Sequence, residues 1–224
     1  MPPLAPLPLK PRKSPVQALS AASVDAILEA TLQVLLVTGK ERLTTTRVAE
    51  RAGVSVGTLY QYFPNKSSLL QALLKEHLDA VASAVENACE AAEGVSLAIM
   101  AQVVTSAFVK AKFSNLDASV ALYAISDDVE GKRIAHQMHA RVTKAMTTLF
   151  QSAREQRIAE PALVAAILLS AMAGVSRSML ERGVTRGTMA MMERELTVLF
   201  RTYLEASSHD VSPAGRALSA PHAK

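Results

Sequence analysis

Apolar residues recur every three or four positions along most of the chain, and no stretch alternates apolar and polar residues as a half-buried strand would. Half of the residues are apolar, but only nine, four Tyr and five Phe, are aromatic, and Trp is absent. This mixture favours helices packed on helices, because a β-sandwich needs more β-branched and aromatic residues. The sequence therefore predicts an all-α protein. Its clearest apolar stripes are Val24, Ile27, Leu28, Leu32 and Leu35; Met100, Val103, Ala107 and Phe108; and Met138, Val142, Ala145 and Leu149.

Residues that begin and end helices divide the chain into about nine of them. Ser23 is a suitable N-cap for the first helix, and Gly39 should end it. Pro64 and Asn65 separate a short helix from a long one, and Pro161 suits the first turn of a late helix. The expected helices cover residues 23–38, 45–52, 55–63, 65–93, 96–113, 116–125, 128–155, 161–182 and 188–206.

The run PALVAAILLSAMAGV, residues 161–175, is the most apolar part of the sequence. It is too short to cross a bilayer, which needs about 20 apolar residues, so we expect no membrane association. We expect instead a helix that is buried on most sides within a bundle. One monomer offers too few neighbours for that, so the last two helices should form a symmetric dimer. Residues available to this interface are Ala166, Ser170, Ala173 and Gly174, and the stripe Met192, Leu196, Leu199 and Tyr203.

Positive charge is concentrated at the start of the chain. Residues 1–78 contain nine Lys or Arg against five acidic residues, whereas residues 79–224 contain 15 of each sign. A basic head on a neutral body points to a polyanion, although the same excess is common on solvated faces.

Two short helices joined by a tight turn are indicated by the helix-ending and helix-capping residues of segment 47–70, RVAERAGVSVGTLYQYFPNKSSLL. Gly53 can adopt the positive φ that ends the first helix, and Ser55 can cap the second. Leu59 and Phe63 share one face of that second helix and should be its core anchors. This arrangement is the helix-turn-helix pattern. The outward face suits base edges in a major groove and consists of Gly57 and Gln61, flanked by Thr58 and Tyr60.

Three residues at or just after that face could contact phosphates: Tyr60, Tyr62 and Lys66. Each tyrosine has a ring that can pack on the small domain and a hydroxyl that can donate to a phosphate oxygen. Lys66 lies in the first turn of the next helix, where the macrodipole disfavours a cation by about 0.3–1 kcal/mol. A lysine in that position suggests an anion nearby, since helix N-termini bind phosphate. The alternative is that the tyrosines only pack and the lysine is solvated.

Residues 43–78, LTTTRVAERAGVSVGTLYQYFPNKSSLLQALLKEHL, closely resemble the DNA-binding domain of the TetR family of bacterial transcriptional regulators. The resemblance implies a homodimer whose recognition helices enter successive major grooves of a palindromic double-stranded operator. It also implies a C-terminal bundle that binds a small effector and then releases the DNA, as a repressor does. The expected domains are a disordered basic Pro-rich arm (1–22), a three-helix helix-turn-helix DNA-binding domain (23–68), a helical effector and dimerisation domain (69–206) and a disordered tail (207–224).

The resemblance also implies roles for single residues. Thr45 would cap the helix of residues 45–52 and meet a phosphate, and Thr46 and Arg47 would face the backbone or the groove edge. Val56 stands where the family sometimes has a polar residue, so a contact with a thymine methyl is its expected role. The remaining expected DNA contacts are Gly57, Thr58 and Gln61 on bases, Tyr60, Tyr62 and Lys66 on phosphates, and the N-cap Ser55.

The body carries no sign of catalysis. It lacks a Glu-x-x-His pair, a nucleophile elbow and a Gly-rich phosphate loop, so we expect no enzyme, no cofactor and no metal. His136 and His139 lie on adjacent turns, but without further ligands they indicate surface or pocket imidazoles. The methionine-rich stripes are ordinary core or the wall of an apolar effector site. The candidate effector contacts are Met100, Phe108, Met138, His139, Met146 and Phe150.

Two further function classes stay open at this point. One is a helix-bundle interaction protein whose basic head binds nucleic acid without sequence preference, and the other is an enzyme. A specific regulator differs from the first in its ratio of specific to non-specific affinity. The single Cys89 permits no internal disulfide and no signal peptide is recognisable, so we expect a cytoplasmic protein.

Overall fold

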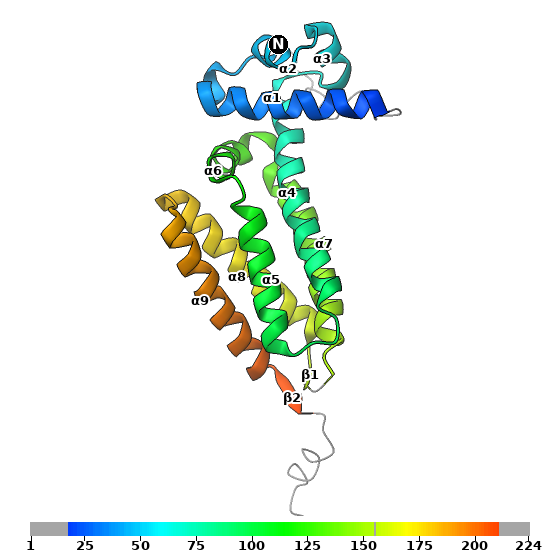
Figure 1. Cartoon of the computed structure of the whole chain (residues 1–224), viewed down its shortest axis with the longest axis vertical. Coiled ribbons are helices and arrows are strands. Elements are labelled where there is room, and N and C mark those ends of the chain that lie inside the picture. Colours follow the sequence, from blue (N-terminus) through cyan, green and yellow to red (C-terminus); the bar gives the residue numbers. More distant parts are fainter. Residues whose placement is uncertain (1–17, 155, 211–224) are drawn as a thin grey trace, which may run out of the picture. The chain divides into compact units, whose positions relative to one another are not determined.

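The computed structural model describes residues 18–154 and 156–210, and α-helices make up most of them (Figure 1). This confirms the all-α fold class. The helices are α1 (Ala18–Arg42), α2 (Thr45–Ala52), α3 (Val56–Tyr62), α4 (Lys66–Ala91), α5 (Leu97–Lys112), α6 (Leu116–Ile125), α7 (Gly131–Gln151), α8 (Pro161–Arg182) and α9 (Arg186–Ala206), with the 3-10 turn η1 (Ser126–Val129) before α7.

Two short strands were not expected from the sequence. β1 (Gln156–Ile158) pairs antiparallel with β2 (Ser208–Asp210), with Arg157 opposite His209. Three-residue strands are too short to show an alternating pattern, so periodicity does not predict them. The pairing carries ordered chain past residue 206, into the segment expected to be a tail. Residues 1–17, most of the expected arm, lie outside the described residues.

The described residues up to Leu78 and the segment Asn115–Ala135 form one compact unit. It therefore combines the predicted helix-turn-helix with α6, η1 and the first residues of α7, which come much later in the sequence. We call it the DNA-binding unit below. Its core is continuous across these segments and includes Ile27, Leu35, Leu43, Val48, Leu59, Phe63, Leu69, Leu70, Leu122, Ile125, Val129 and Ile134.

The first helix differs from its expected bounds. It begins at Ala18, so Ser23 lies inside the helix and the prediction of an N-cap there is wrong. Ala21 and Ala22 are strong helix formers, and they let the helix continue past the serine. Gly39 breaks the helical geometry as expected, with φ 72°, but one more turn follows it to Arg42.

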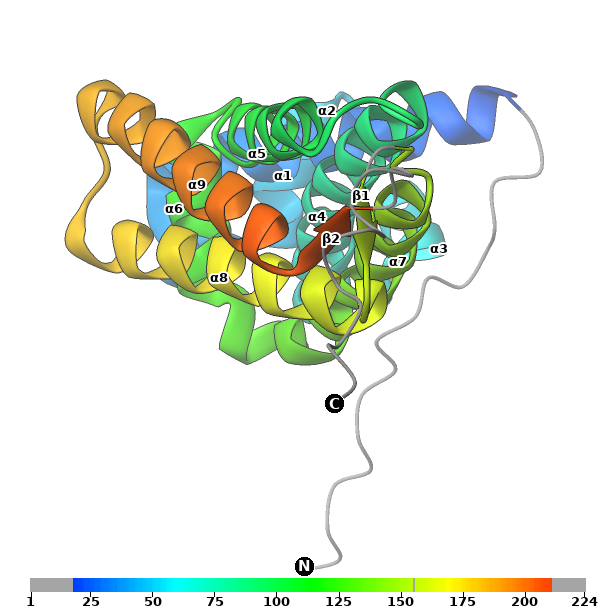
Figure 2. The ribbon, with the colours of Figure 1, turned by 90° about the horizontal axis from the view of Figure 1, so that it is seen from below.

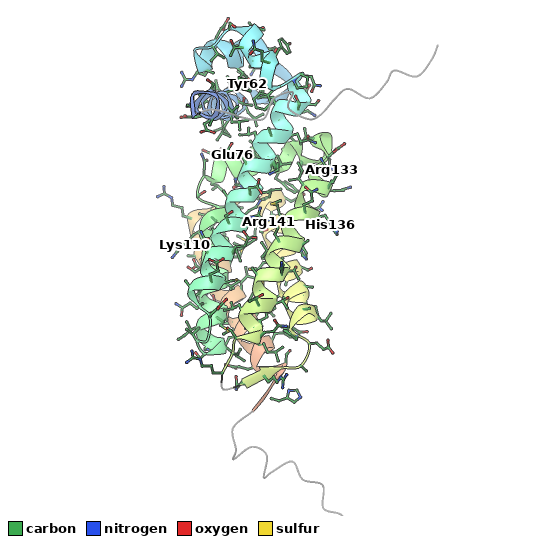
Figure 3. All side chains as sticks on the ribbon, turned by 90° about the vertical axis from the view of Figure 1, so that its right-hand side faces the viewer. Tyr62, Glu76, Lys110, Arg133, His136 and Arg141 are labelled. Carbon is green, nitrogen blue, oxygen red and sulfur yellow. The ribbon has the colours of Figure 1, made fainter. Side chains whose placement is uncertain are left out.

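A second compact unit consists of Asp79–Ser114 and the described residues from His136 onwards. We call it the body; it contains the second half of α4, then α5, most of α7, α8 and α9. In the body, α9 packs closely along α5, and the hydroxyls of Thr105 and Thr197 lie 2.7 Å apart between them. Arg141 of α7 connects to α4 through Asp79 at 2.7 Å and Glu86 at 2.6 Å (Figure 3).

Helix α8 is less buried than the sequence suggested. One face, with Val164, Leu168 and Met172, is buried in the body, but Leu163 and Ile167 on the opposite face are exposed. Helix α9 follows α8 after a short connection (Figure 2). By length and composition alone, α8 and residues 21–42 of α1 could each cross a membrane. In α1 those apolar residues form the core of the DNA-binding unit.

Candidate nucleic-acid interface

The turn between α2 and α3 has the geometry that the sequence predicts. Gly53 has φ 69° in the left-handed region, and its N–H donates to the carbonyls of Ala49 and Glu50. Ser55 caps α3, accepting a 3.0 Å hydrogen bond from the N–H of Thr58. Ala49 is fully buried, and its small side chain lets the two helices approach closely. The end of α2 and the start of α3 are therefore both capped by residues of the turn itself.

The two faces of α3 are also as predicted. Leu59 is fully buried and Phe63, just after the helix, is 2% exposed, so these two side chains anchor α3 in the core. On the other side Gly57, Tyr60 and Gln61 are exposed. These exposed residues carry no charge, and the hydroxyl of Tyr60 and the amide of Gln61 can hydrogen-bond to base edges in a groove.

Val56, Thr58 and Tyr62 are only partly exposed. Val56 and Tyr62 pack against the core of the DNA-binding unit, so each offers only its outer atoms to a ligand. The hydroxyl of Thr58 lies 2.8 Å from the hydroxyl of Ser55. Both hydroxyls therefore serve the helix start, and a base would meet them as one shared donor and acceptor group.

Thr45 and Tyr60, two expected phosphate contacts, come together in the structure. Their hydroxyl oxygens lie 3.0 Å apart, joining the first residue of α2 to the outer face of α3. The prediction that Thr45 caps α2 is wrong. Thr44 is the N-cap, and its side chain accepts from the N–H of Arg47 at 3.3 Å. Three threonines in a row left the choice of cap undetermined from sequence, and the extended backbone of Thr44 decides it.

Lys66 has a neighbour that the sequence did not suggest. It is partly buried, and its ammonium group donates to the carbonyl of Lys40 at the end of α1. Carbonyls at a helix C-terminus lack intrahelical partners and attract cations. This contact gives Lys66 a structural task, while two of its three N–H donors stay available for a phosphate. The start of α4 is capped as predicted, by Asn65 accepting from the N–H of Ser68 at 2.8 Å.

Arginines line the side of α2 that faces α1. Arg47 donates to the carbonyl of Arg42 at 2.8 Å, and Arg51, one turn later, donates to the side-chain carbonyl of Gln33. Both are exposed and border a shallow groove of about 290 Å³ whose apolar wall includes Val34 and Val37. Arg51 is not among the expected DNA contacts, and its spacing of four residues from Arg47 places both arginines on the same side of α2. Thr46 is exposed beside Thr45.

The candidate effector residues belong to the core of the body. Met100 and Met146 are fully buried, and Phe108, Met138 and Phe150 are at most 9% exposed. His139 is partly exposed, and burial together with the nearby His136 lowers its pKa. Within the described residues no group of three His, Cys, Asp or Glu could hold a metal ion.

A capped helix-turn-helix with an exposed polar recognition face, followed by a separate helical body, defines a DNA-binding transcriptional regulator. Residues 27–73 match the family described as bacterial regulatory proteins, tetR family, and residues 96–204 match the tetracyclin repressor-like C-terminal domain. The chain belongs to the TetR family of bacterial transcriptional regulators.

Similar proteins of known sequence match this chain over short stretches. The nucleoid occlusion factor SlmA of Glaesserella parasuis is 38% identical over 63 residues, which is 28% of this chain and 31% of SlmA. The transcriptional repressor KstR of Rhodococcus jostii is 44% identical over 61 residues, 27% of this chain and 29% of KstR. The chain thus matches less than a third of the length of these relatives.

Solved structures share the whole fold. The match with a TetR-family regulator from Mesorhizobium loti has a TM-score of 0.72 and 18% identity, and it covers 85% of this chain and 98% of that chain. The match with the repressor AlkX from a Dietzia strain has a TM-score of 0.55 and 20% identity, and it covers 84% of this chain and 99% of AlkX. At these identities the likeness concerns the fold alone.

Proposed function

We propose that this regulator is a repressor that binds a palindromic operator as a homodimer and is released by a small apolar effector. The observation that carries the DNA part is the exposed face of α3, Gly57, Tyr60 and Gln61, with the Tyr60 hydroxyl placed beside Thr45. A polar face for bases bordered by hydroxyls for phosphates is what sequence-specific binding requires. The regulator acts in the cytoplasm, where the chromosome lies.

Base readers and backbone contacts should respond differently to substitution. Gln61→Ala is expected to relax the preference at particular base pairs by about 1–3 kcal/mol. Lys66→Ala is expected to weaken binding to all sequences by a similar factor and to lower the salt slope by about one. Fluorescence anisotropy on operator and unrelated duplexes over a salt series measures both.

Genomic fragments retained by the purified protein would supply the operator for these measurements. Because Lys66 also contacts the end of α1, circular dichroism must first show that the variant is folded. A Lys66→Ala variant that changed base preference and kept the salt slope would show that the backbone and base roles are wrongly assigned. Equal affinity for operator and unrelated DNA would favour the non-specific binder instead.

We assign the dimer contacts to α8 and α9. Exposed apolar side chains on these helices support this: Leu163, Ile167, Val175, Met191, Val198 and Leu199. A patch of this kind on a soluble protein marks an interaction surface. The expected stripe on α9 needs adjustment, because Met192 and Leu196 are buried in the body while Leu199 is exposed. Light scattering at micromolar concentration should give twice the mass of 23.9 kDa.

The effector site is proposed to lie among Met100, Phe108, Met138, His139, Met146 and Phe150. All of these side chains except His139 are at most 9% exposed, so an effector has to displace them on entering. Methionines adapt readily to such a change because their side chains are flexible. His139, whose lowered pKa favours the neutral imidazole, would give one polar contact at an otherwise apolar wall.

Release would operate through α4, whose residues belong to the DNA-binding unit up to Leu78 and to the body from Asp79. In the dimer the recognition helices must stand about 34–36 Å apart to enter successive grooves, so a small tilt of α4 would break the register. Linkage requires that operator DNA weaken effector binding by the same factor as effector weakens DNA binding, typically 1–3 kcal/mol.

Thermal-shift screening with fatty acids and other apolar molecules would identify an effector, which is then titrated with and without operator. Equal affinity in both titrations would show a ligand that is not an inducer. Tighter binding in the presence of operator would make it a co-repressor.

A further inference from the structure

The hydroxyl oxygen of Thr143, in the middle of α7, is buried and has no hydrogen-bond partner among the described residues. A threonine inside a helix can donate to the backbone carbonyl four residues earlier. Other threonines of the described helices do so, at 2.6–3.3 Å between the two oxygens: Thr31, Thr38, Thr105, Thr147, Thr148 and Thr197. Thr143 could donate in the same way to the carbonyl of His139, but its hydroxyl is turned elsewhere.

An unpaired buried hydroxyl destabilises the folded chain, because it has lost its hydrogen bonds to water and has gained none within the protein. Thr143 is partly exposed as a residue, so its buried hydroxyl is directed into the body and away from solvent. Proteins tolerate such a cost mainly at sites where function needs it. A group that a ligand supplies would pair the hydroxyl and remove the cost.

Thr143 lies among the candidate effector contacts of α7, although it is not one of the expected contacts itself. His139 precedes it by four residues, Met146 follows three residues later and Phe150 four residues after that. This spacing places all four side chains on one side of the helix. Met146 and Phe150 are at most 2% exposed, so the unpaired hydroxyl stands between an imidazole and two buried apolar side chains.

We propose, on the basis of the effector site proposed above, that Thr143 and His139 together bind the polar group of an apolar effector and that this group is an uncharged oxygen, as in an alcohol. Side chains one helical turn apart have their Cβ atoms about 5–6 Å from each other, so one oxygen can lie between them. The threonine hydroxyl can donate and accept, and a neutral imidazole offers one donor and one acceptor. An alcohol oxygen can therefore bond to both, while Met146 and Phe150 contact the hydrocarbon part.

The charges near Thr143 disfavour a carboxylate as the polar group. A carboxylate that leaves water needs a cation to compensate the lost hydration. Arg141 lies on the side of α7 that faces α4, and two carboxylates of α4 already pair with it (Figure 3). Lys144 is exposed on the outer side of α7. Burial, and then His136, lower the pKa of His139, which favours its neutral form. An uncharged oxygen avoids the cost of a buried, unpaired charge.

Thr143→Val tests the unpaired hydroxyl in the absence of any ligand. Valine has nearly the same shape and puts a methyl group in place of the hydroxyl, so the melting temperature of the full-length protein should rise by about 2–4 °C. Thr147→Val is the matched control one turn later, because its hydroxyl donates to the carbonyl of Thr143 at 2.7 Å. That substitution should not raise the melting temperature. Melts followed by circular dichroism measure both, and a lower melting temperature for Thr143→Val would overturn the proposal.

Octanol, octanoate and octane test the polar group, because they share a hydrocarbon chain and differ at one end. The rise in melting temperature with ligand concentration gives each affinity. Octanol should bind the wild-type protein more tightly than the other two. Thr143→Val and His139→Leu should each weaken octanol binding by about fivefold and leave octane binding unchanged, since only octanol loses a hydrogen bond.

The outcomes separate this assignment from the effector site itself. Octanoate binding as tight as that of octanol would overturn the uncharged group. Equal losses for octanol and octane in Thr143→Val would show that the substitution changes the shape of the site and that Thr143 does not bind the polar group. Either result would leave an effector site among these residues in place. If none of the three molecules binds, this inference is overturned, and the screen described above then decides whether the body binds an effector at all.

Discussion

The hydroxyls of Tyr60 and Thr45 lie 3.0 Å apart on the outer surface of the helix-turn-helix. One hydroxyl donates to the other, so the pair keeps one O–H that can donate to a phosphate oxygen. The sequence predicts a phosphate contact for Thr45 and another for Tyr60, but it does not show that the two are neighbours. Removing the hydroxyl oxygen of Tyr60 tests what the pair contributes to DNA binding.

Tyr60→Phe should weaken binding to every DNA sequence by a similar factor, about fivefold, because a typical hydrogen bond contributes about 1 kcal/mol. Thermal stability should be nearly unchanged, since the pair is exposed and the ring stays in place. Anisotropy titrations on operator and unrelated duplexes measure the effect, with Thr45→Val as the matched variant. Loss of preference at one base pair would instead place Tyr60 among the base readers.

In the DNA-binding unit, the pKa of Glu76 is shifted in a clear direction. Partial burial of its carboxyl group, and then the carboxylate of Asp25, raise its pKa. An acid whose pKa is raised by folding costs stability once it ionises, so stability falls as the pH rises from the unfolded pKa through the folded one.

Glu76→Gln should therefore be more stable than the wild type at pH 7 and should lose most of this advantage near pH 4, where the Glu76 carboxyl is largely protonated in both the folded and the unfolded chain. Urea unfolding at the two pH values measures it. Glu50→Gln, an exposed position on α2, is the control. An advantage for Glu76→Gln that is equal at both pH values would exclude ionisation as its cause.

Within the body, ion pairs connect helices α4 and α7. Arg141 bonds to Glu86 through two nitrogens and to Asp79 through one, and its pKa is raised mainly by the hydrogen bond with Glu86. The side chains of Asp79 and Glu86 are 29% and 26% exposed. Removing the arginine would leave two partly buried carboxylates without their cation.

Arg141→Met should lower the stability of the body by about 1–2 kcal/mol, less than for a fully buried pair, because Arg141 itself is 39% exposed. Urea unfolding followed by circular dichroism measures the loss. Arg194→Met, which breaks an exposed pair with Glu195, should change stability by less than about 0.5 kcal/mol. Equal effects of the two substitutions would show that the ion pairs of Arg141 do not stabilise the body more than an exposed pair does.

At the scale of the whole molecule, the DNA-binding unit is discontinuous in sequence. Its core includes Leu122, Ile125, Val129 and Ile134, each at most 2% exposed. The segment is anchored by the buried Gln71, which donates to the carbonyl of Val129 at 3.3 Å. It also requires Gly131, where an added Cβ would lie 2.4 Å from the carbonyl oxygen of Ser126.

A fragment that ends at Leu78 should therefore fail to fold stably. Burial of each of the four missing side chains contributes about 1.5–3 kcal/mol, and their sum is comparable with the total stability of a small domain. Circular dichroism and operator binding of the fragment test this. Leu122→Ala in the full chain should cost about 2–5 kcal/mol and gives the milder version of the test. A fragment that melted cooperatively and bound operator would show that the later segment is dispensable.

The helix-turn-helix and most of its helix ends could be predicted from local sequence. Gly53, Ser55 and Asn65 act through hydrogen bonds to residues within four positions, and the core face of α3 follows from helical periodicity, so no distant information was needed. Three features appear only in the folded chain: residues 115–135 complete the DNA-binding unit, Lys66 contacts the carbonyl of Lys40, and Tyr60 contacts Thr45. The same holds for the exposed face of α8, which composition suggested was buried. These features depend on residues brought together from far along the chain, and periodicity shows that a helix has an apolar face without showing what covers it.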